Sequence, residues 1–207
     1  MIPSDNIIDP LLKEILGHVN REAMPLGIDF YVAGAVARDY HLSKMPEYIP
    51  SRRTGDLDVA VMVADEEQFI QLKKALMDTS FFQEHKEPIK LIYKDAIELD
   101  LLPFGEIEEA GIIRLTKPKT FTLDMPGFTL LNEFTEIVQW DEELKAKICA
   151  LEGIILLKLI AYNDKPHRTK DLTDIQQIIK HYFDISSDDI YENHFDLMEL
   201  YDTSDRD

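Results

Sequence analysis

The sequence predicts an α/β fold, and three observations support this prediction. Apolar residues recur at helical spacing over residues 6–24, alternate at the period of a strand over 56–63, and return to helical spacing over 65–79. Segments of both periods that follow one another are typical of an α/β protein. The chain has 207 residues, of which 45% are hydrophobic, so it is long enough to bury a core. We expect a single domain over residues 1–207.

The first predicted helix is followed by a strand that ends at a glycine. The apolar residues of the helix over 6–24 are Ile8, Leu11, Leu12, Ile15, Leu16 and Val19. Residues 29–33 read as a short strand ending at Gly34, and helical spacing resumes over 35–42. The chain is therefore expected to turn sharply at Gly34.

The alternating segment 56–63 places two aspartates on one face of a strand. The apolar residues at 57, 59, 61 and 63 point one way, so Asp56 and Asp58 share the opposite face. Asp65 is the predicted N-cap of the next helix, with Gln68 as its capping-box partner. This helix is expected to end at about residue 79.

Further strands are predicted at 89–93 and 97–102, where Asp100 lies opposite the main apolar face. Prolines and glycines make residues 105–138 irregular, with short strands. Residues 144–150 fit both a strand and a helix, and we prefer a strand followed by a helix over 151–163.

The chain is expected to close with a helical part over about residues 150–201, after a core over 29–149. One helix over 170–182 is predicted to bury Leu172, Ile175, Ile179 and Tyr182. A last helix is expected over 188–201, and the tail, 202–207, is too polar to be ordered by packing.

Three carboxylates on neighbouring strands, Asp56, Asp58 and Asp100, form the central candidate site. At about 4 Å two like charges repel by about 4 kcal/mol at an effective dielectric near 20, so such a cluster stays ionised only with cations between its members. Hard divalent cations such as Mg²⁺ or Mn²⁺ fit oxygen ligands, and two such ions suit nucleotidyl transfer from an NTP. Gly34, before a helix start, lets backbone amides approach phosphate oxygens. A D-x-D pair alone is common on strands, and the combination with Gly34 and Asp100 favours catalysis.

Several segments resemble a known superfamily. The stretches YVAGAVARD (31–39) and RTGDLDV (53–59) resemble the nucleotidyltransferases that include DNA polymerase β and tRNA CCA-adding enzymes. The runs at 99–105, 153–161 and 168–175 narrow the resemblance to AbiEii-type nucleotidyltransferases, several of which are toxins of toxin-antitoxin pairs. This resemblance implies a polymerase β-like core, with a mixed sheet flanked by helices and a C-terminal helical part.

The resemblance also implies roles for individual residues. Asp56 and Asp58 would bind both metal ions, and Asp100 would help to activate the attacking group. The residues implied in nucleotide binding are Gly34, Ala35, Lys158 and one of Asp171 and Asp174. The superfamily usually has Gly-Gly or Gly-Ser where this chain has Gly34-Ala35, so a serine contact to phosphate is missing while the backbone amide remains.

Other polar residues have two interpretations. Lys158 either reaches a phosphate or extends to solvent from an apolar helix, and Asp171 and Asp174 either complete the site or form a solvated helix face. Arg38 either binds phosphate or only pairs with Asp39. Two further sets are candidates for binding nucleotide or an RNA end, or are ordinary loop residues: Arg52, Arg53 and Thr54, and the basic cluster Lys165, His167, Arg168 and Lys170.

The overall charge limits the choice of partner. With 22 basic and 40 acidic residues the formal net charge is −18, which weighs against broad adhesion to nucleic acid. The single cysteine, Cys149, and the lack of a secretion signal or a long apolar run predict a cytoplasmic protein with no membrane segment. The acceptor stays open between an RNA end, a protein hydroxyl and a small molecule such as an aminoglycoside. A protein antitoxin is a possible partner, and a non-catalytic nucleotide-binding or interaction protein is the alternative to an enzyme.

Overall fold

The computed structural model describes residues 9–48, 55–140 and 142–196 of the chain. The strands are β1 (Asp29–Val32), β2 (Asp56–Met62), β3 (Phe82–Glu84), β4 (Lys90–Tyr93), β5 (Ile97–Phe104), β6 (Ile112–Leu115), β7 (Phe121–Asp124), β8 (Thr135–Gln139) and β9 (Lys145–Cys149). The helices are α1 (Pro10–Ala23), α2 (Gly34–Leu42), α3 (Glu66–Asp78), α4 (Phe128–Leu131), α5 (Leu151–Asp164) and α6 (Thr169–Asn193), with short 3-10 turns at Met24–Leu26 and Asn132–Phe134.

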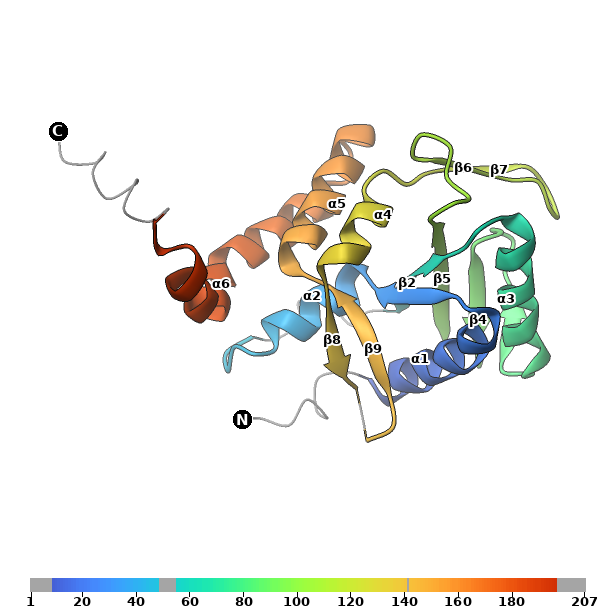
Figure 1. Cartoon of the computed structure of the whole chain (residues 1–207), viewed down its shortest axis with the longest axis horizontal. Helices are drawn as coiled ribbons and strands as arrows, with labels where there is room; N and C mark the ends of the chain where they lie inside the picture. Colours follow the sequence, from blue (N-terminus) through green and yellow to red (C-terminus); the bar gives the residue numbers. More distant parts are fainter. Residues whose placement is uncertain (1–8, 49–54, 141, 197–207) are drawn as a thin grey trace.

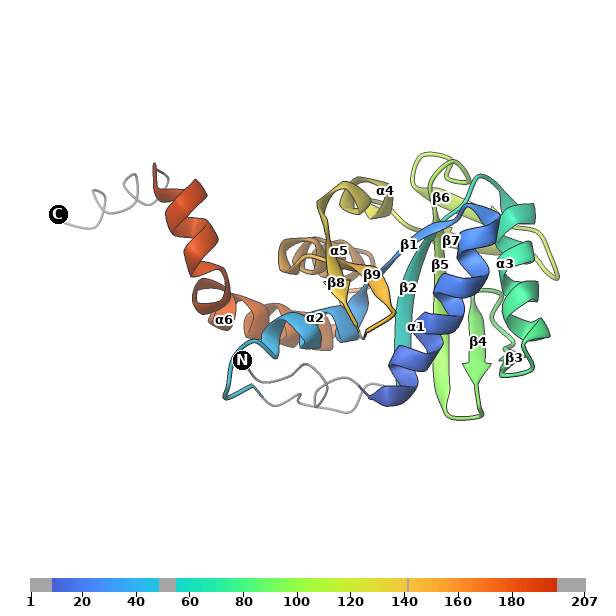
Figure 2. The ribbon, with the colours of Figure 1, turned by 60° about the horizontal axis from the view of Figure 1, so that its bottom comes forward.

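Within these ranges, seven strands form one mixed sheet in the order β3-β4-β5-β2-β1-β9-β8, and β6 and β7 form a separate hairpin. β2 runs parallel to β5 and antiparallel to β1, and β1 runs parallel to β9. Helices α1 and α3 lie side by side on one face of the sheet, whereas α2, α5 and α6 gather near β8 and β9 (Figures 1 and 2). The predicted fold class, an α/β mixed sheet flanked by helices, is confirmed.

Local signals in the sequence explain where the first helices begin. The Asp9 carboxylate caps α1 by accepting a hydrogen bond from the backbone N–H of Leu11, at 3.0 Å. The predicted N-cap of α3 is confirmed, because Asp65 accepts from the N–H of Gln68 at 2.9 Å. The Gln68 amide oxygen returns a bond to the N–H of Ala64. The predicted helix start at residue 6 lies outside the described residues, and α1 begins at Pro10.

Strand β2 divides the sheet into an apolar and a polar face, as its alternation predicts. The side chains of Leu57, Val59 and Val61 are wholly buried. Asp56 and Asp58, on the opposite face, are exposed and partly buried respectively. The core therefore packs against the apolar face of β2, while the face with Asp56 and Asp58 is more exposed.

The connection between β5 and β9 contains more regular structure than predicted. The hairpin of β6 and β7 matches the expected short strands, whereas α4 was not predicted. Before β4, outside this connection, the edge strand β3 was not predicted either. The predicted strand and helix after residue 144 are confirmed as β9 and α5.

The prediction for the C-terminal part is wrong in two respects. A single helix, α6, replaces the two helices predicted over 170–182 and 188–201, although residues 197–201 lie outside the described ranges. The predicted buried residues Leu172 and Ile179 are 37% and 62% exposed, whereas Asp171 and Asp174 are buried. The helix is turned this way because buried and partly buried cations contact both carboxylates. No helix in the described part of the chain has the length and apolar character needed to cross a bilayer.

Candidate functional site

A pocket of about 450 Å³ opens between the polar face of the sheet, the start of α2, and the helices α5 and α6. Of the predicted site residues that the structure describes, seven line this pocket: Gly34, Ala35, Asp56, Asp58, Asp100, Lys158 and Asp171. Arg38 and Asp174 are buried outside its lining. The predicted residues Arg53 and Thr54 lie outside the described ranges.

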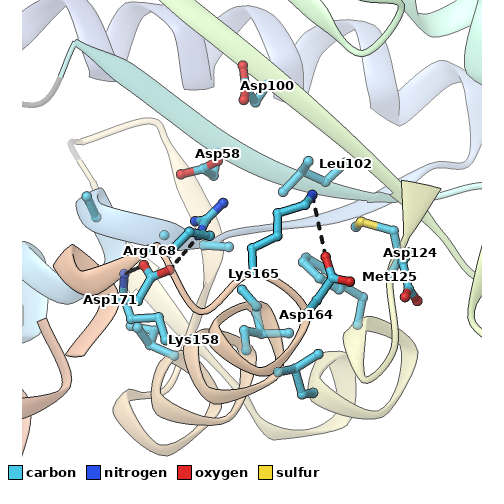
Figure 3. Close-up of a pocket in the computed structure, with 18 of the residues that line it drawn as sticks. Asp58, Asp100, Leu102, Asp124, Met125, Lys158, Asp164, Lys165, Arg168 and Asp171 are labelled. Carbon is cyan, nitrogen blue, oxygen red and sulfur yellow. Dashed lines mark hydrogen bonds and ion pairs between the residues drawn. The ribbon is translucent and has the colours of Figure 1, made fainter. Parts of the chain in front are cut away.

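Strand pairing brings the aspartates together. β2 and β5 are parallel neighbours, and their register places Asp58 directly beside Asp100 and Asp56 beside Glu98. Side chains at these positions share one face of the sheet. Figure 3 shows Asp58 and Asp100 on adjacent strands, across the pocket from the residues of α5 and α6.

The turn from β1 into α2 is shaped to receive the Asp58 carboxylate. Gly34, the first residue of α2, has a φ of +63°, and a Cβ atom placed on it would lie 2.0 Å from Asp58 Oδ2. A side chain at this position would thus meet both a left-handed backbone and an occupied space. The N–H of Ala33 donates to the Asp58 carbonyl at 2.9 Å, which fixes the turn against β2. The first residues of α2, Gly34 and Ala35, therefore line the same pocket as the carboxylates.

The Asp58 carboxyl carries an unfavourable charge in the absence of a cation. Burial raises its pKa to about 7, and the neighbouring Asp100 and Asp56 raise it further, against the opposing effect of Lys90 and Lys158. Burial also raises the pKa of Asp100, although a hydrogen bond from Lys90 opposes the shift. Such a site favours any ligand that supplies positive charge.

Asp56, Asp58 and Asp100 have the chemistry of ligands for a divalent cation, but they do not form a ready metal site. Three carboxylates are the oxygen donors that Mg²⁺ and Mn²⁺ prefer. Among the described residues, however, no three His, Cys, Asp or Glu side chains are grouped as a metal site.

Lys158 belongs to an ion-pair network at the pocket wall, and this excludes the alternative that it merely extends to solvent. Its Nζ atom lies 3.0 Å from Asp171 Oδ1 and 2.6 Å from Asp174 Oδ2. Arg168 Nε donates to Asp171 Oδ2 at 2.6 Å (Figure 3). Burial alone would raise the pKa of Asp171, but the hydrogen bonds from Arg168 and Lys158 outweigh it and lower the pKa. Asp171 is thus held ionised beside the pocket.

Arg38 pairs with Asp39, which is one of the two roles considered for it from the sequence. Its side chain is fully buried, and its Nε atom donates to Asp39 Oδ1 at 2.7 Å. The guanidinium also contacts Asp174, and the Tyr48 hydroxyl donates to Asp39 at 2.8 Å. Arg38 therefore joins α2 to α6 instead of reaching the pocket.

The rest of the pocket combines an apolar wall with a basic rim. The apolar wall is formed by Met125 and Pro126 of the β7–α4 connection and by Phe128, the first residue of α4. The Tyr31 hydroxyl holds this wall by donating to the Phe128 carbonyl at 3.0 Å. The rim includes three members of the basic cluster noted in the sequence: Lys165, Arg168 and Lys170. The apolar wall escaped prediction because it comes from the segment with the weakest periodicity.

Lys90 is a further polar residue of the site that sequence reasoning missed. It bonds both carboxylate oxygens of Asp100, at 2.7 and 2.8 Å. In the antiparallel β4–β5 hairpin Tyr93 pairs with Ile97. Three residues further from the turn on each strand, the same register pairs Lys90 with Asp100. The short spacing of the two predicted strands was the signal that could have found it.

Comparison with known proteins supports the fold. No protein-family model and no curated protein matches the sequence. An antigenic nucleotidyltransferase-like protein from Paracoccidioides brasiliensis matches with 19% identity and a TM-score of 0.52, over 82% of this chain and 75% of that one. At this identity the likeness shows a shared fold.

Two further solved structures match less closely. A lincosamide antibiotic adenylyltransferase, LnuA, solved with lincomycin bound, has 15% identity and a TM-score of 0.46, over 83% of this chain and 96% of its own. ANT(2″)-Ia, in complex with adenylyl-2″-tobramycin, has 13% identity and a TM-score of 0.45, over 79% of this chain and 84% of its own.

Proposed function

We propose that the protein is a metal-dependent nucleotidyltransferase, which moves a nucleoside monophosphate from an NTP to a hydroxyl acceptor. The observation that carries this proposal is the seating of the Asp58 carboxylate against Gly34, where α2 begins. Asp56 and Asp100 line the same pocket. Cation ligands thus stand beside a helix N-terminus, which is the combination that a nucleoside triphosphate and its metal ions require.

Asp56, Asp58 and Asp100 would hold the Mg²⁺ or Mn²⁺ ions, for which the sequence resemblance implies two. Bound there, these ions supply Lewis-acid chemistry and neutralise charge on the phosphates. Asp100 would help to activate the attacking hydroxyl, as the sequence resemblance implies. The AbiEii-type resemblance is consistent with these assignments and stays a prediction.

The nucleotide would bind between α2 and the α5–α6 connection. Gly34 and Ala35, at the start of α2, line the pocket, and their backbone amides would bind phosphate oxygens. Lys158 and Arg168 lie at the opposite wall, held in place by Asp171. The base and sugar would then lie against the apolar wall formed by Met125, Pro126 and Phe128.

For the acceptor we favour an RNA end, in keeping with a toxin-type enzyme. The basic rim of Lys165, Arg168 and Lys170 supports this choice, because it places positive charge on the α5–α6 side of a pocket whose lining also contains six carboxylates. A polycationic small molecule, such as an aminoglycoside, is the second candidate. Two additional carboxylates in the pocket lining, Asp124 and Asp164, favour this candidate, because they would attract a cationic acceptor.

The first test is a thermal-shift titration of the whole chain with Mg²⁺ or Mn²⁺ and each of the four NTPs. Asp58→Asn, which keeps the shape of the side chain, is the matched variant. At ligand concentrations about 100-fold above the dissociation constant, binding stabilises the native state by about 2.7 kcal/mol, which is readily seen as a rise in melting temperature. We expect a rise that requires metal and that the variant reduces.

Labelled NTP then identifies the acceptor. Transfer of label to RNA, lost in Asp58→Asn, supports the RNA end, and transfer to an aminoglycoside supports the second candidate. A metal-independent thermal shift that Asp58→Asn leaves intact, with no transfer to either acceptor, would instead support a non-catalytic nucleotide-binding protein.

A further inference from the structure

A lysine occupies the same sheet face as the three aspartates. β4 and β5 pair so that Lys90 lies opposite Asp100, and β2 and β5 pair so that Asp58 lies beside Asp100 on the other side. The three residues therefore form one row across three adjacent strands, with the carboxylate of Asp100 in the middle.

The contacts in this row are close and well shielded. Lys90 Nζ lies 2.7 and 2.8 Å from the two Asp100 carboxylate oxygens and 3.0 Å from Glu98 Oε2. The side chains of Lys90 and Asp100 are only 16% and 13% exposed. Because both oxygens of Asp100 accept from the same ammonium group, part of the capacity of that carboxylate to bind a cation is already used.

We propose that Lys90 is a positioning residue that competes with a divalent cation for Asp100, and so keeps the affinity of the metal site low. The inference rests on the proposed function, because it concerns the same carboxylates. Lys90 holds Asp100 in place while the site is without metal. An ion that takes Asp100 as a ligand must displace the Lys90 ammonium or bind close to it.

Simple electrostatics gives the direction of the effect. A positive charge within a few ångströms of a divalent ion repels it strongly when both are shielded from water. Here the ammonium group of Lys90 already contacts both oxygens of Asp100. Metal affinity should therefore rise when the charge of Lys90 is removed.

A purely structural role for Lys90 predicts a different result. Cross-strand ion pairs stabilise a hairpin modestly, so loss of Lys90 would then lower stability while metal affinity stayed the same or fell. An increase in metal affinity separates the two roles.

The experiment is a titration of the whole chain with Mn²⁺ alone, in which electron paramagnetic resonance measures the free ion at constant ionic strength. Four variants are compared with the wild-type protein: Lys90→Met, Lys90→Gln, Lys90→Arg and Lys86→Met. Lys86 is an exposed lysine in the loop before β4, so its variant removes the same charge nearby without touching Asp100. The glutamine variant is a second neutral substitution in case methionine disturbs folding, and circular dichroism confirms the fold of each.

We expect Lys90→Met and Lys90→Gln to bind Mn²⁺ about tenfold more tightly than the wild-type protein, and Lys90→Arg and Lys86→Met to stay within about twofold of it. Unchanged or weaker binding in the neutral Lys90 variants would overturn the inference, as would an equal gain in Lys86→Met. If the wild-type protein binds Mn²⁺ and NTP while the Lys90 variants match it, the inference alone fails. If no protein binds either ligand, the proposed function fails as well.

Discussion

The Oδ2 atom of Asp58 lies 2.0 Å from the position that a Cβ atom on Gly34 would occupy, and Asp58 Cγ lies 2.8 Å from it. Both distances are far below van der Waals contact. The strand that carries the carboxylate and the turn that begins α2 thus fit together only if residue 34 has no side chain. The contact ties the conformation of this turn to the position of the Asp58 carboxylate.

Gly34→Ala should therefore damage both stability and ligand binding. The new methyl group must displace Asp58, and the residue must also keep a φ of +63°, so we expect a loss of about 1–3 kcal/mol in the free energy of unfolding. Metal-dependent binding of NTP should be lost. Urea denaturation and calorimetric titration measure the two effects.

Gly17→Ala is the control for this substitution. Gly17 lies inside α1, and a Cβ atom added to it would have no other atom within 4 Å, so alanine there should stabilise the protein by about 0.5–1 kcal/mol. Similar behaviour of the two variants would show that the contact between Gly34 and Asp58 is unimportant.

Asp58→Asn should change how stability depends on pH. The pKa of the Asp58 carboxyl is raised from 3.8 to about 7 in the folded protein, so the folded state keeps a proton that the unfolded state releases. The free energy of unfolding should accordingly fall as pH rises from about 4 to about 7 and then level off. Asparagine carries no charge, so the variant should be more stable than the wild-type protein at about pH 8, by about 1–3 kcal/mol, with the difference shrinking toward pH 4.

Denaturation curves recorded with a chelator at several pH values test this expectation. Parallel pH curves for the two proteins would mean that another group is responsible. Adding Mg²⁺ should narrow the difference at high pH, because the ion compensates the charge in the wild-type protein alone.

Arg38→Met should destabilise the protein strongly, although Arg38 does not line the pocket. The substitution leaves the buried carboxylates of Asp39 and Asp174 without this cation, which typically costs about 3–5 kcal/mol. Arg114→Met removes an arginine that is 57% exposed and pairs with Glu109, so it should change stability by less than about 1 kcal/mol. Chemical denaturation compares them, and equal effects would contradict a special role for the buried pair.

Lys158→Met should weaken NTP binding about tenfold or more, because it removes a pocket-lining cation that also orients Asp171. The comparison variant is Lys180→Met, which removes an exposed lysine from α6. Calorimetric titration with a non-hydrolysable NTP gives the affinities. Equal affinities in both variants would mean that Lys158 acts only within its ion pairs.

Much of the sheet could be predicted because its residues obey a simple period. The alternation over β2 correctly places Asp56 and Asp58 on one face, and the short strand before Gly34 marks the turn. The pairing of β2 with β5 joins segments about 40 residues apart, and it confirms the prediction that Asp58 and Asp100 lie on neighbouring strands.

The C-terminal helix shows where the periodic signal fails. Leu172 and Ile179 have the spacing of a buried stripe, yet the helix buries Asp171 and Asp174 instead. Hydrophobic patterns cannot reveal this arrangement, since the cations that compensate the carboxylates come from α2, from α5 and from the residue before α6. The position of Lys90 likewise could not be predicted from a hydrophobic pattern, because it depends on the register between β4 and β5.

The link between Arg38 in α2 and Asp174 in α6 also sets an order of events during synthesis. Arg38 leaves the ribosome early, whereas Asp174 belongs to one of the last elements to emerge. Until then the guanidinium lacks one of its buried anions, and the wall formed by α6 is absent from the pocket. The sheet can form first, but a competent pocket must await the C-terminal helix, so a ribosome-bound chain that stops short of α6 should bind no nucleotide.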